Sequence, residues 1–251
     1  MIQIKNLCVG YPGWPVLKHA TLELTPGKVV AILGPNGSGK STMLKAIAGI
    51  LPKTSGDILL DAQPLERFSP REIAKKVAYL PQSRVVPNIS ARRMVLHGRF
   101  PYLAYPRHYG KRDWDMVETA LSRVGAEDLA ERALPTLSGG QRQKIYLAMA
   151  LAQDTQTILM DEPTTYLDMN CQLEVMALVS HLAKEGKTMI LVLHDLCMAL
   201  QHADQIILLQ DGKVMYCETP EELYQNHSIE DVMKVRIGRI STALGWRYFY
   251  L

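Results

Sequence analysis

The sequence lacks a long apolar run and lacks a strong excess of charge of either sign. No apolar stretch approaches the roughly 20 residues that a membrane-spanning helix needs. Residues 1–5 do not have the basic-then-apolar layout of a signal peptide. The formal net charge is only +3, and the basic residues stand in dispersed pairs, so no nucleic-acid partner is expected. If the protein works at a membrane, it must therefore dock onto another chain.

Cysteines are also few, and none of the four stands in a C-x-x-C or other ligand-like spacing. Three of them lie among apolar neighbours, as buried free thiols do. We expect reduced core residues of a cytosolic protein rather than disulfides or a metal site. The four positions are Cys8, Cys171, Cys197 and Cys217.

What the chain does contain is an alternation of short apolar strands and amphipathic helices over most of its 251 residues. This alternation predicts an α/β fold with a largely parallel sheet. Between about residues 83 and 153 no segment is convincing as a strand, which predicts a helical insertion. We expect one domain over residues 1–251, with a core formed by 1–84 and 154–225. The helical subdomain covers 85–153, and 226–251 is a C-terminal extension packed on the core.

Turn and capping signals divide the chain further. A turn is predicted at Pro12-Gly13-Trp14-Pro15, and Asp211-Gly212 between apolar runs indicates a hairpin. Thr219-Pro220-Glu221-Glu222 has the capping residue, proline and glutamate of a helix start. The tail from Val235 to Leu251 can form two short strands around Gly245.

A phosphate-binding loop is the clearest chemical motif. Residues 34–41 match G-x-x-x-x-G-K-[ST] at every fixed position, between a buried strand (28–33) and a helix (40–48). Glycines let the backbone turn several N–H groups toward phosphate oxygens, and the helix N-terminus adds positive potential. Lys40 supplies a full charge, and Ser41 a hydroxyl for Mg²⁺. The nucleotide-binding residues predicted here are Gly34, Pro35, Asn36, Gly37, Ser38, Gly39, Lys40, Ser41 and Thr42.

Two carboxylates end the apolar strand that begins at Thr157. Ligand sites of open α/β sheets lie at the carboxyl ends of strands. Asp161 can organise Mg²⁺, and Glu162 can orient and deprotonate an attacking water. Gln82 and His194 also follow predicted strands, so Gln82 can contact the metal or the water and His194 can reach the γ-phosphate. The competing interpretation is that residues 34–41 are only a Gly-rich turn and Asp161 and Glu162 only an acidic turn. It is weak because both motifs occur in one chain and each directly follows an apolar strand.

The segment Leu137-Ser138-Gly139-Gly140-Gln141, placed between the phosphate loop and the acidic strand, resembles the signature of ABC transporter ATPase subunits. The resemblance covers nearly the whole chain. It implies a P-loop NTPase of ABC type, with a RecA-like core, an N-terminal antiparallel β-subdomain and the inserted helical subdomain. It implies ATP and Mg²⁺ as cofactors, and a head-to-tail homodimer in which the signature of one copy completes the site of the other. The residues it adds to the site are Tyr11 for the adenine, Ser138, Gly139, Gly140 and Gln141 for the phosphates, and Asp168 for the contact between subunits.

Other segments of the sequence resemble one subgroup of these ATPases. Tyr166 departs from the small residue of most relatives, and together with Gly98-Arg99-Phe100-Pro101-Tyr102 it resembles ATPases of iron-siderophore, haem and cobalamin importers. That implies polytopic permease subunits as partners, a substrate-binding protein acting through them, and a peripheral place on the cytoplasmic face of the inner membrane. A soluble ABC ATPase without a transporter, such as an assembly machine, would carry the same catalytic residues and stays as the alternative.

Overall fold

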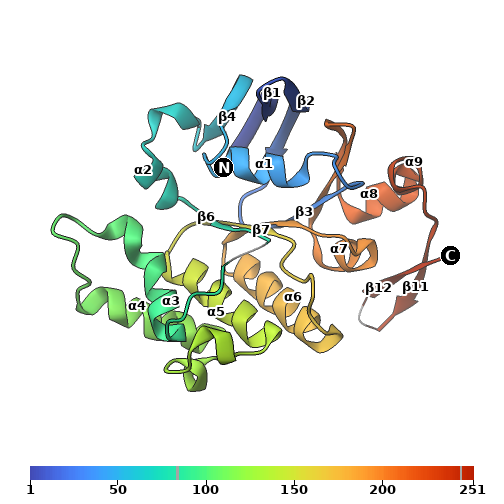
Figure 1. Ribbon diagram of the computed structural model, residues 1–251. Helices are drawn as coiled ribbons and strands as arrows, with labels where there is room; N and C mark the ends of the chain where they lie inside the picture. Colours follow the sequence, from blue (N-terminus) through green and yellow to red (C-terminus); the bar gives the residue numbers. More distant parts are fainter. Residues whose placement is uncertain (83–84, 244) are drawn as a thin grey trace.

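Two sheets with a helix between them form the centre of the molecule (Figure 1). The computed structural model describes residues 1–82, 85–243 and 245–251. The strands are β1 Ile2–Tyr11, β2 Trp14–Leu24, β3 Val29–Leu33, β4 Lys53–Leu60, β5 Gln63–Pro64, β6 Val77–Leu80, β7 Thr157–Asp161, β8 Thr188–Val192, β9 Gln205–Gln210, β10 Lys213–Glu218, β11 Ile237–Thr242 and β12 Gly245–Tyr250. The helices are α1 Lys40–Ile47, α2 Pro70–Ala74, α3 Ala91–Leu96, α4 Lys111–Arg123, α5 Gly139–Ala152, α6 Met169–Lys184, α7 Leu196–His202, α8 Pro220–Gln225 and α9 Ser228–Met233.

The larger sheet has the strand order β10-β9-β3-β8-β7-β6, and its five strands from β9 to β6 run parallel. The smaller sheet, β2-β1-β4-β5, is antiparallel. The predicted α/β class with a parallel sheet and an N-terminal antiparallel β-subdomain is confirmed. Because β3, β8, β7 and β6 are neighbours in that order, the residues that follow their carboxyl ends meet at one edge of the sheet.

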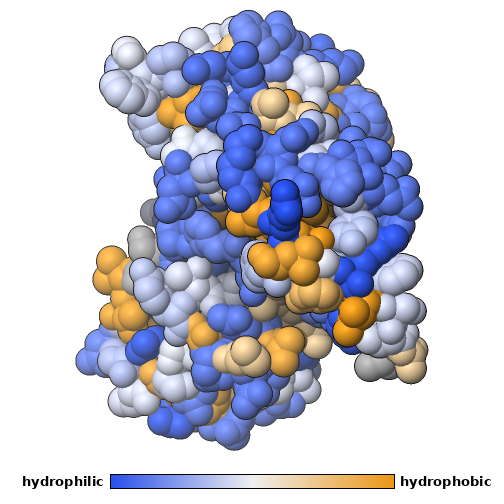
Figure 2. All heavy atoms as spheres, turned by 90° about the vertical axis from the view of Figure 1, so that its right-hand side faces the viewer, coloured by the Kyte–Doolittle hydropathy of each residue, from blue (hydrophilic) through white to orange (hydrophobic). Residues whose placement is uncertain are grey.

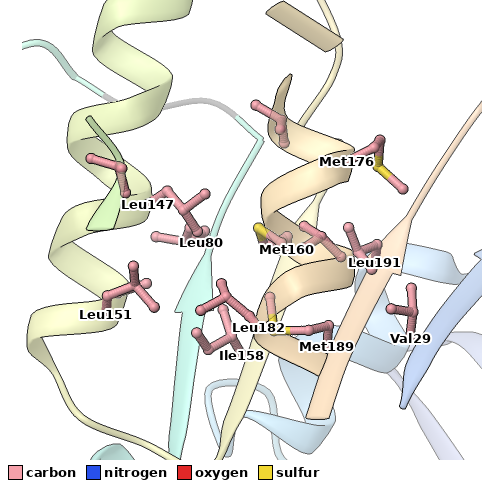
Figure 3. Packing of buried hydrophobic residues seen from close by; sticks show 14 of the residues in the cluster. Val29, Leu80, Leu147, Leu151, Ile158, Met160, Met176, Leu182, Met189 and Leu191 are labelled. Carbon is pink, nitrogen blue, oxygen red and sulfur yellow. The ribbon is translucent and has the colours of Figure 1, made fainter. Parts of the chain in front are cut away.

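Apolar residues cover both faces of the larger sheet, as expected for buried parallel strands. Val30 and Ile32 of β3 pack with α1 and the smaller sheet, whereas Val29, Ala31 and Leu33 face the helices of the other side. Figure 3 shows this second cluster, in which side chains of α5 and α6 lie against those of β6, β7 and β8. The helix α1, which starts at Lys40, is thus fixed between two sheets.

The helical part of the chain between β6 and β7 contains α3, α4 and α5. A buried ion pair joins its segments, because Arg99 Nε lies 3.0 Å from Asp113 Oδ1 at the start of α4. Arg99 also donates to the carbonyl of Ala152 at the end of α5 (2.8 Å). The predicted boundary at residue 84 lies outside the described residues.

Local signals explain several element ends. Thr219 and Glu222 form the predicted reciprocal capping box at the start of α8, and Asp211-Gly212 connects β9 to β10. The predicted turn at 12–15 is too long, because Gly13 at φ 76° closes a two-residue turn and Trp14 and Pro15 already belong to β2.

The four cysteines are free and partly buried, and Cys197 and Cys217 pack against the two apolar clusters. The predicted core position is wrong for the other two. Cys8 lies on the face of β1 opposite the buried residues Leu7 and Val9, and Cys171 lies in the first turn of α6.

The C-terminal elements lie beside the larger sheet. The hairpin β11–β12 packs on α7, where the hydroxyl of Tyr250 accepts a hydrogen bond from the amide of Leu196 (3.2 Å). Figure 2 views this side of the molecule and shows a mostly hydrophilic surface with a few apolar patches. In the part of the chain that the structure describes, no helix has the length and apolar character needed to cross a membrane.

Candidate active site

The phosphate loop connects β3 to α1 and holds the ammonium of Lys40 inward. Lys40 Nζ donates to the carbonyl oxygens of Gly34 (2.8 Å) and Pro35 (3.0 Å). Burial lowers the pKa of Lys40, and the carboxylates of Glu162 and Asp161 oppose that shift. A buried cation whose partners here are neutral carbonyls is suited to exchange them for phosphate oxygens.

The loop also fits a phosphate sterically. The hydroxyl of Ser38 is buried, and no hydrogen-bond partner for it is found among the described residues. A phosphate oxygen in the loop would supply an acceptor. Gly34 permits the close packing of the loop, because a Cβ there would lie 2.1 Å from the carbonyl oxygen of Leu209. Gly39, at φ 102°, precedes the helix and packs against Leu17 of β2, which anchors the loop to the smaller sheet.

Asp161, at the end of β7, lies directly opposite the start of α1. Ser41 Oγ donates to Asp161 Oδ1 (2.9 Å), and the hydroxyl of Tyr79 donates to Asp161 Oδ2 (3.3 Å). Asp161 is 4% exposed, and burial raises the pKa of its carboxyl. A hydroxyl beside a carboxylate is an oxygen donor pair of the kind that Mg²⁺ uses together with substrate phosphates, so these residues fit that ion.

Glu162 is held by donors from three other segments. Gln82 Nε2 donates to Glu162 Oε2, and Thr165 Oγ1 lies 3.1 Å from the same oxygen. His194 Nε2 lies 2.6 Å from Oε1. The side chain of Glu162 is 11% exposed and that of His194 is 46% exposed. The four residues therefore form one network at the rim of the sheet, open to solvent on the His194 side.

The backbone of Glu162 is itself unusual. Its φ of 54° lies in the left-handed region that side-chain-bearing residues rarely adopt. Its N–H donates to the carbonyl of Val192, the last residue of β8 (3.2 Å). This bond extends the pairing of β7 with β8 by one step, and the left-handed φ of Glu162 then turns the chain after β7, where the carboxylate contacts Gln82 and His194.

The signature segment lies elsewhere on the chain. Ser138 caps α5 in a reciprocal capping box with Gln141, in which Ser138 Oγ accepts from the amide of Gln141 and Gln141 Oε1 accepts from that of Ser138. Gly140 lies close to α6, because a Cβ there would be 2.4 Å from Cys171 Sγ and would require that side chain to move.

Gly139 faces a groove of about 530 Å³, which it lines with Gln82, Thr165 and Tyr166. No residue of the loop 34–42 is among those that line this groove. The signature segment thus borders the Glu162 network, because Gln82 and Thr165 belong to both the groove and that network.

Two further predicted residues lie apart from this network. Asp168 caps α6 by accepting from the amide of Cys171 (2.9 Å), which lowers the pKa of its carboxyl. Tyr11 ends β1 and is 49% exposed. Tyr11 pairs with Trp14 at the turn end of the β1–β2 hairpin, and Gly39 of the phosphate loop lies against Val16 and Leu17 near that end of β2.

The prediction from sequence omitted Tyr79 and Thr165 as members of the site. Tyr79 lies three residues before Gln82, and Thr165 three after Glu162. Their proximity to Gln82 and Glu162 in the sequence is a signal, but neither residue has a fixed place in a nucleotide-binding motif.

Comparison with known proteins decides the family. Residues 17–165, more than half of the chain, match the family described as ABC transporter. The chain belongs to this family.

Two curated relatives cover most of this ABC protein. It is 40% identical to the petrobactin import ATP-binding protein FpuD of Bacillus anthracis, over 96% of this chain and 89% of that protein. It is 41% identical to the hemin import ATP-binding protein HmuV of Nocardia farcinica, over 81% of this chain and 70% of the relative. The predicted membership of the ABC ATP-binding subunits, and with it ATP hydrolysis as the enzymatic activity, is confirmed.

A solved structure agrees in fold and itself holds an adenine nucleotide. The dimeric ATP-binding cassette MJ0796 bound to ADP and phosphate is 31% identical, with a TM-score of 0.77, over 88% of this chain and 99% of that one. The ABC-type P-loop fold and nucleotide binding are therefore established for this ABC protein.

Proposed function

We propose that this ABC ATPase powers the import of a metal chelate through membrane permease subunits, with Mg²⁺ as its metal ion. The observation that carries the catalytic part is the meeting of Lys40, Asp161 and Glu162 at one edge of the sheet. The proposed role in transport is supported by the resemblance of Tyr166 and residues 98–102 to importer ATPases and by the names of the relatives.

Mg²⁺ would be held by Ser41 Oγ and Asp161, with the amide oxygen of Gln82 as a third donor. The ion would neutralise charge on the phosphate oxygens. Lys40 and the N–H groups of the loop 34–42 would bind those oxygens, while Tyr11 stacks on the adenine. The 2.9 Å contact of Ser41 with Asp161 supports this pairing, since both donors already lie side by side.

Glu162 is the residue we assign as general base. It orients the attacking water and accepts its proton, while His194 and Gln82 hold its carboxylate and report the γ-phosphate. The contacts of Glu162 with both residues support these roles.

Two copies of the chain would complete two sites. Ser138, Gly139, Gly140 and Gln141 of one copy would bind the ATP held by the loop of the other, with Asp168 at the contact between them. Ser138 and Gly139 are exposed and therefore available to a second copy, which supports this arrangement. The dimeric state of the similar cassette MJ0796 supports it too.

The surface for the permease would be the segment 85–106. Val85 is 90% exposed, Phe100 51% and Tyr105 96%, so all three are available to a partner. Tyr102 is not, because its hydroxyl donates to the carbonyl of Gln153 (3.0 Å) and its ring lies against Arg99. Docking there would hold the ATPase on the cytoplasmic face of the inner membrane, with a substrate-binding protein acting on the opposite side of the permease.

The cargo would belong to the iron-siderophore, haem or cobalamin class. The relatives are named for petrobactin and hemin import, which supports the siderophore and haem members of that class more directly than cobalamin.

The substitution Glu162→Gln tests the catalytic part. We expect it to lower ATP turnover by about 10²-fold or more and to preserve ATP binding, because it removes the base but keeps the shape of the side chain. Glu23→Gln, on the exposed face of β2, is a matched control that should change neither quantity. Appreciable steady-state hydrolysis by Glu162→Gln, measured as phosphate release, would show that Glu162 is not the base.

A pull-down tests the transport part. Tagged Glu162→Gln protein with ATP and Mg²⁺ would be incubated with detergent-solubilised native membranes, and its partners identified by mass. Stoichiometric recovery of a polytopic membrane protein supports the importer. Recovery of soluble partners alone would favour the alternative, a soluble ABC ATPase without a transporter.

A further inference from the structure

A tyrosine outside the known motifs touches the carboxylate at the metal position. Tyr79 lies on β6, next to β7, where its register partner is Leu159. Leu159 and Asp161 are on the same face of β7, since side chains alternate along a strand. The ring of Tyr79 therefore extends diagonally along β7, and its hydroxyl donates to Asp161 Oδ2 (3.3 Å).

The two oxygens of Asp161 are thus held by two different elements. Ser41, in the first turn of α1, donates to Oδ1, and Tyr79 donates to Oδ2. The Tyr79 ring is partly buried and packs against the apolar cluster between α1 and the two sheets. Its hydroxyl is therefore fixed by packing, and the plane of the Asp161 carboxylate is fixed with it.

We propose that Tyr79 is a positioning residue for the metal ion, which sets the rotation of the Asp161 carboxylate so that Oδ1 faces the ion together with Ser41 Oγ. The inference rests on the proposed metal role of Ser41 and Asp161. A carboxylate held at one oxygen only would turn about its Cβ–Cγ bond, and metal affinity would fall because part of that freedom is lost on binding.

A purely structural role makes a different prediction. If the Tyr79 hydroxyl only offsets the burial of a carboxylate, its removal would lower the stability of the protein and leave metal affinity unchanged. Metal affinity, measured without turnover, separates the two roles.

Tyr216 offers a matched control. Its hydroxyl donates to Asp231 Oδ2 of α9 at 3.2 Å, the same pair of groups at nearly the same distance. Tyr216 is also partly buried, and it lies on β10, at the opposite side of the larger sheet from β6 and β7. The substitutions Tyr79→Phe and Tyr216→Phe each remove one hydroxyl and keep the ring.

The experiment uses the full chain with a non-hydrolysable ATP analogue and Mn²⁺ as the probe ion, and electron paramagnetic resonance measures free Mn²⁺. We expect Tyr79→Phe to weaken Mn²⁺ binding about tenfold, and Tyr216→Phe to leave it within about twofold of the unsubstituted protein. Analogue affinity in excess chelator should stay within about twofold in both variants, which also shows that they are folded.

Unchanged Mn²⁺ affinity in Tyr79→Phe would overturn the inference, and so would an equal loss of analogue affinity in chelator. If the unsubstituted protein itself showed no nucleotide-dependent Mn²⁺ binding, the proposed metal role of Ser41 and Asp161 would fail, and the inference with it. The two failures are distinguishable, because only the second is seen without any substitution.

Discussion

Arg99 is the charged side chain whose removal should destabilise the helical part of this ABC protein most. Its side chain is 4% exposed, and that of its partner Asp113 is 14% exposed. The guanidinium also satisfies the carbonyl of Ala152 and stacks on Tyr102 at 3.9 Å. One cation thus connects the segment after α3, the start of α4 and the end of α5.

The substitution Arg99→Met keeps much of the apolar length and removes the charge. It leaves Asp113 as a largely buried anion without its cation, which typically costs about 3–5 kcal/mol in free energy of unfolding. Replacing Asp113 by Asn in the same protein removes the orphaned charge and keeps an oxygen that can accept from the amide of Gly110, as Asp113 does. The double variant should therefore recover at least about 1 kcal/mol relative to Arg99→Met alone.

Urea denaturation followed by tryptophan fluorescence measures the free energy of unfolding of both variants, since Trp114 of α4 packs against the apolar cluster that includes side chains of α3, α4 and α5. The control is Arg92→Met, because Arg92 pairs with Glu118 and Glu131 at the surface and its side chain is 38% exposed. That change should cost less than about 1 kcal/mol. Equal losses for Arg99→Met and Arg92→Met would show that burial does not set how much these ion pairs contribute to stability.

Two other predictions concern packing and pH. Gly98→Ala would place a Cβ 2.2 Å from the carbonyl of Met149 and should lower the free energy of unfolding, measured in urea titrations, by about 2 kcal/mol or more. Gly37→Ala has open space but a φ of 79°, so it should lower that free energy by only about 1 kcal/mol, and the reverse order would contradict both expectations. Burial, with a smaller effect of Arg247, lowers the pKa of His202 below its ordinary 6.5. The unfolded chain therefore binds more protons at this residue than the folded chain, and stability falls as the pH drops from 6.5 through the pKa of the folded state. His202→Gln should reduce the stability lost between about pH 7.5 and about pH 5.5, and an equal loss would exclude His202 as its source.

Features encoded by neighbouring residues were predictable from the sequence. The capping box at Thr219 and the hairpin at Asp211-Gly212 have the predicted form because both depend on contacts within four residues. Ser69-Pro70-Arg71-Glu72 carries the same kind of signal, and an equivalent capping box there starts the short helix α2, which was not predicted. Likewise, Asp195 caps the unpredicted helix α7.

Features that depend on strand order were less accessible. That Gln82, Glu162 and His194 meet follows from β8 and β6 flanking β7, and the sequence predicts only that each residue ends a strand. The contact between Tyr79 and Asp161 depends in addition on the register of β6 against β7. Neither the order nor the register is encoded in the spacing of the motifs.

The left-handed backbone of Glu162 sets stability against chemistry at a single position. A side-chain-bearing residue in that conformation costs about 1–2 kcal/mol relative to glycine. Selection for heat tolerance alone would therefore favour Glu162→Gly, which relaxes the turn after β7 and discards the carboxylate. Laboratory evolution of a more stable form of this ABC protein thus needs a screen for phosphate release at every round, since the same change that stabilises the fold would abolish ATP hydrolysis.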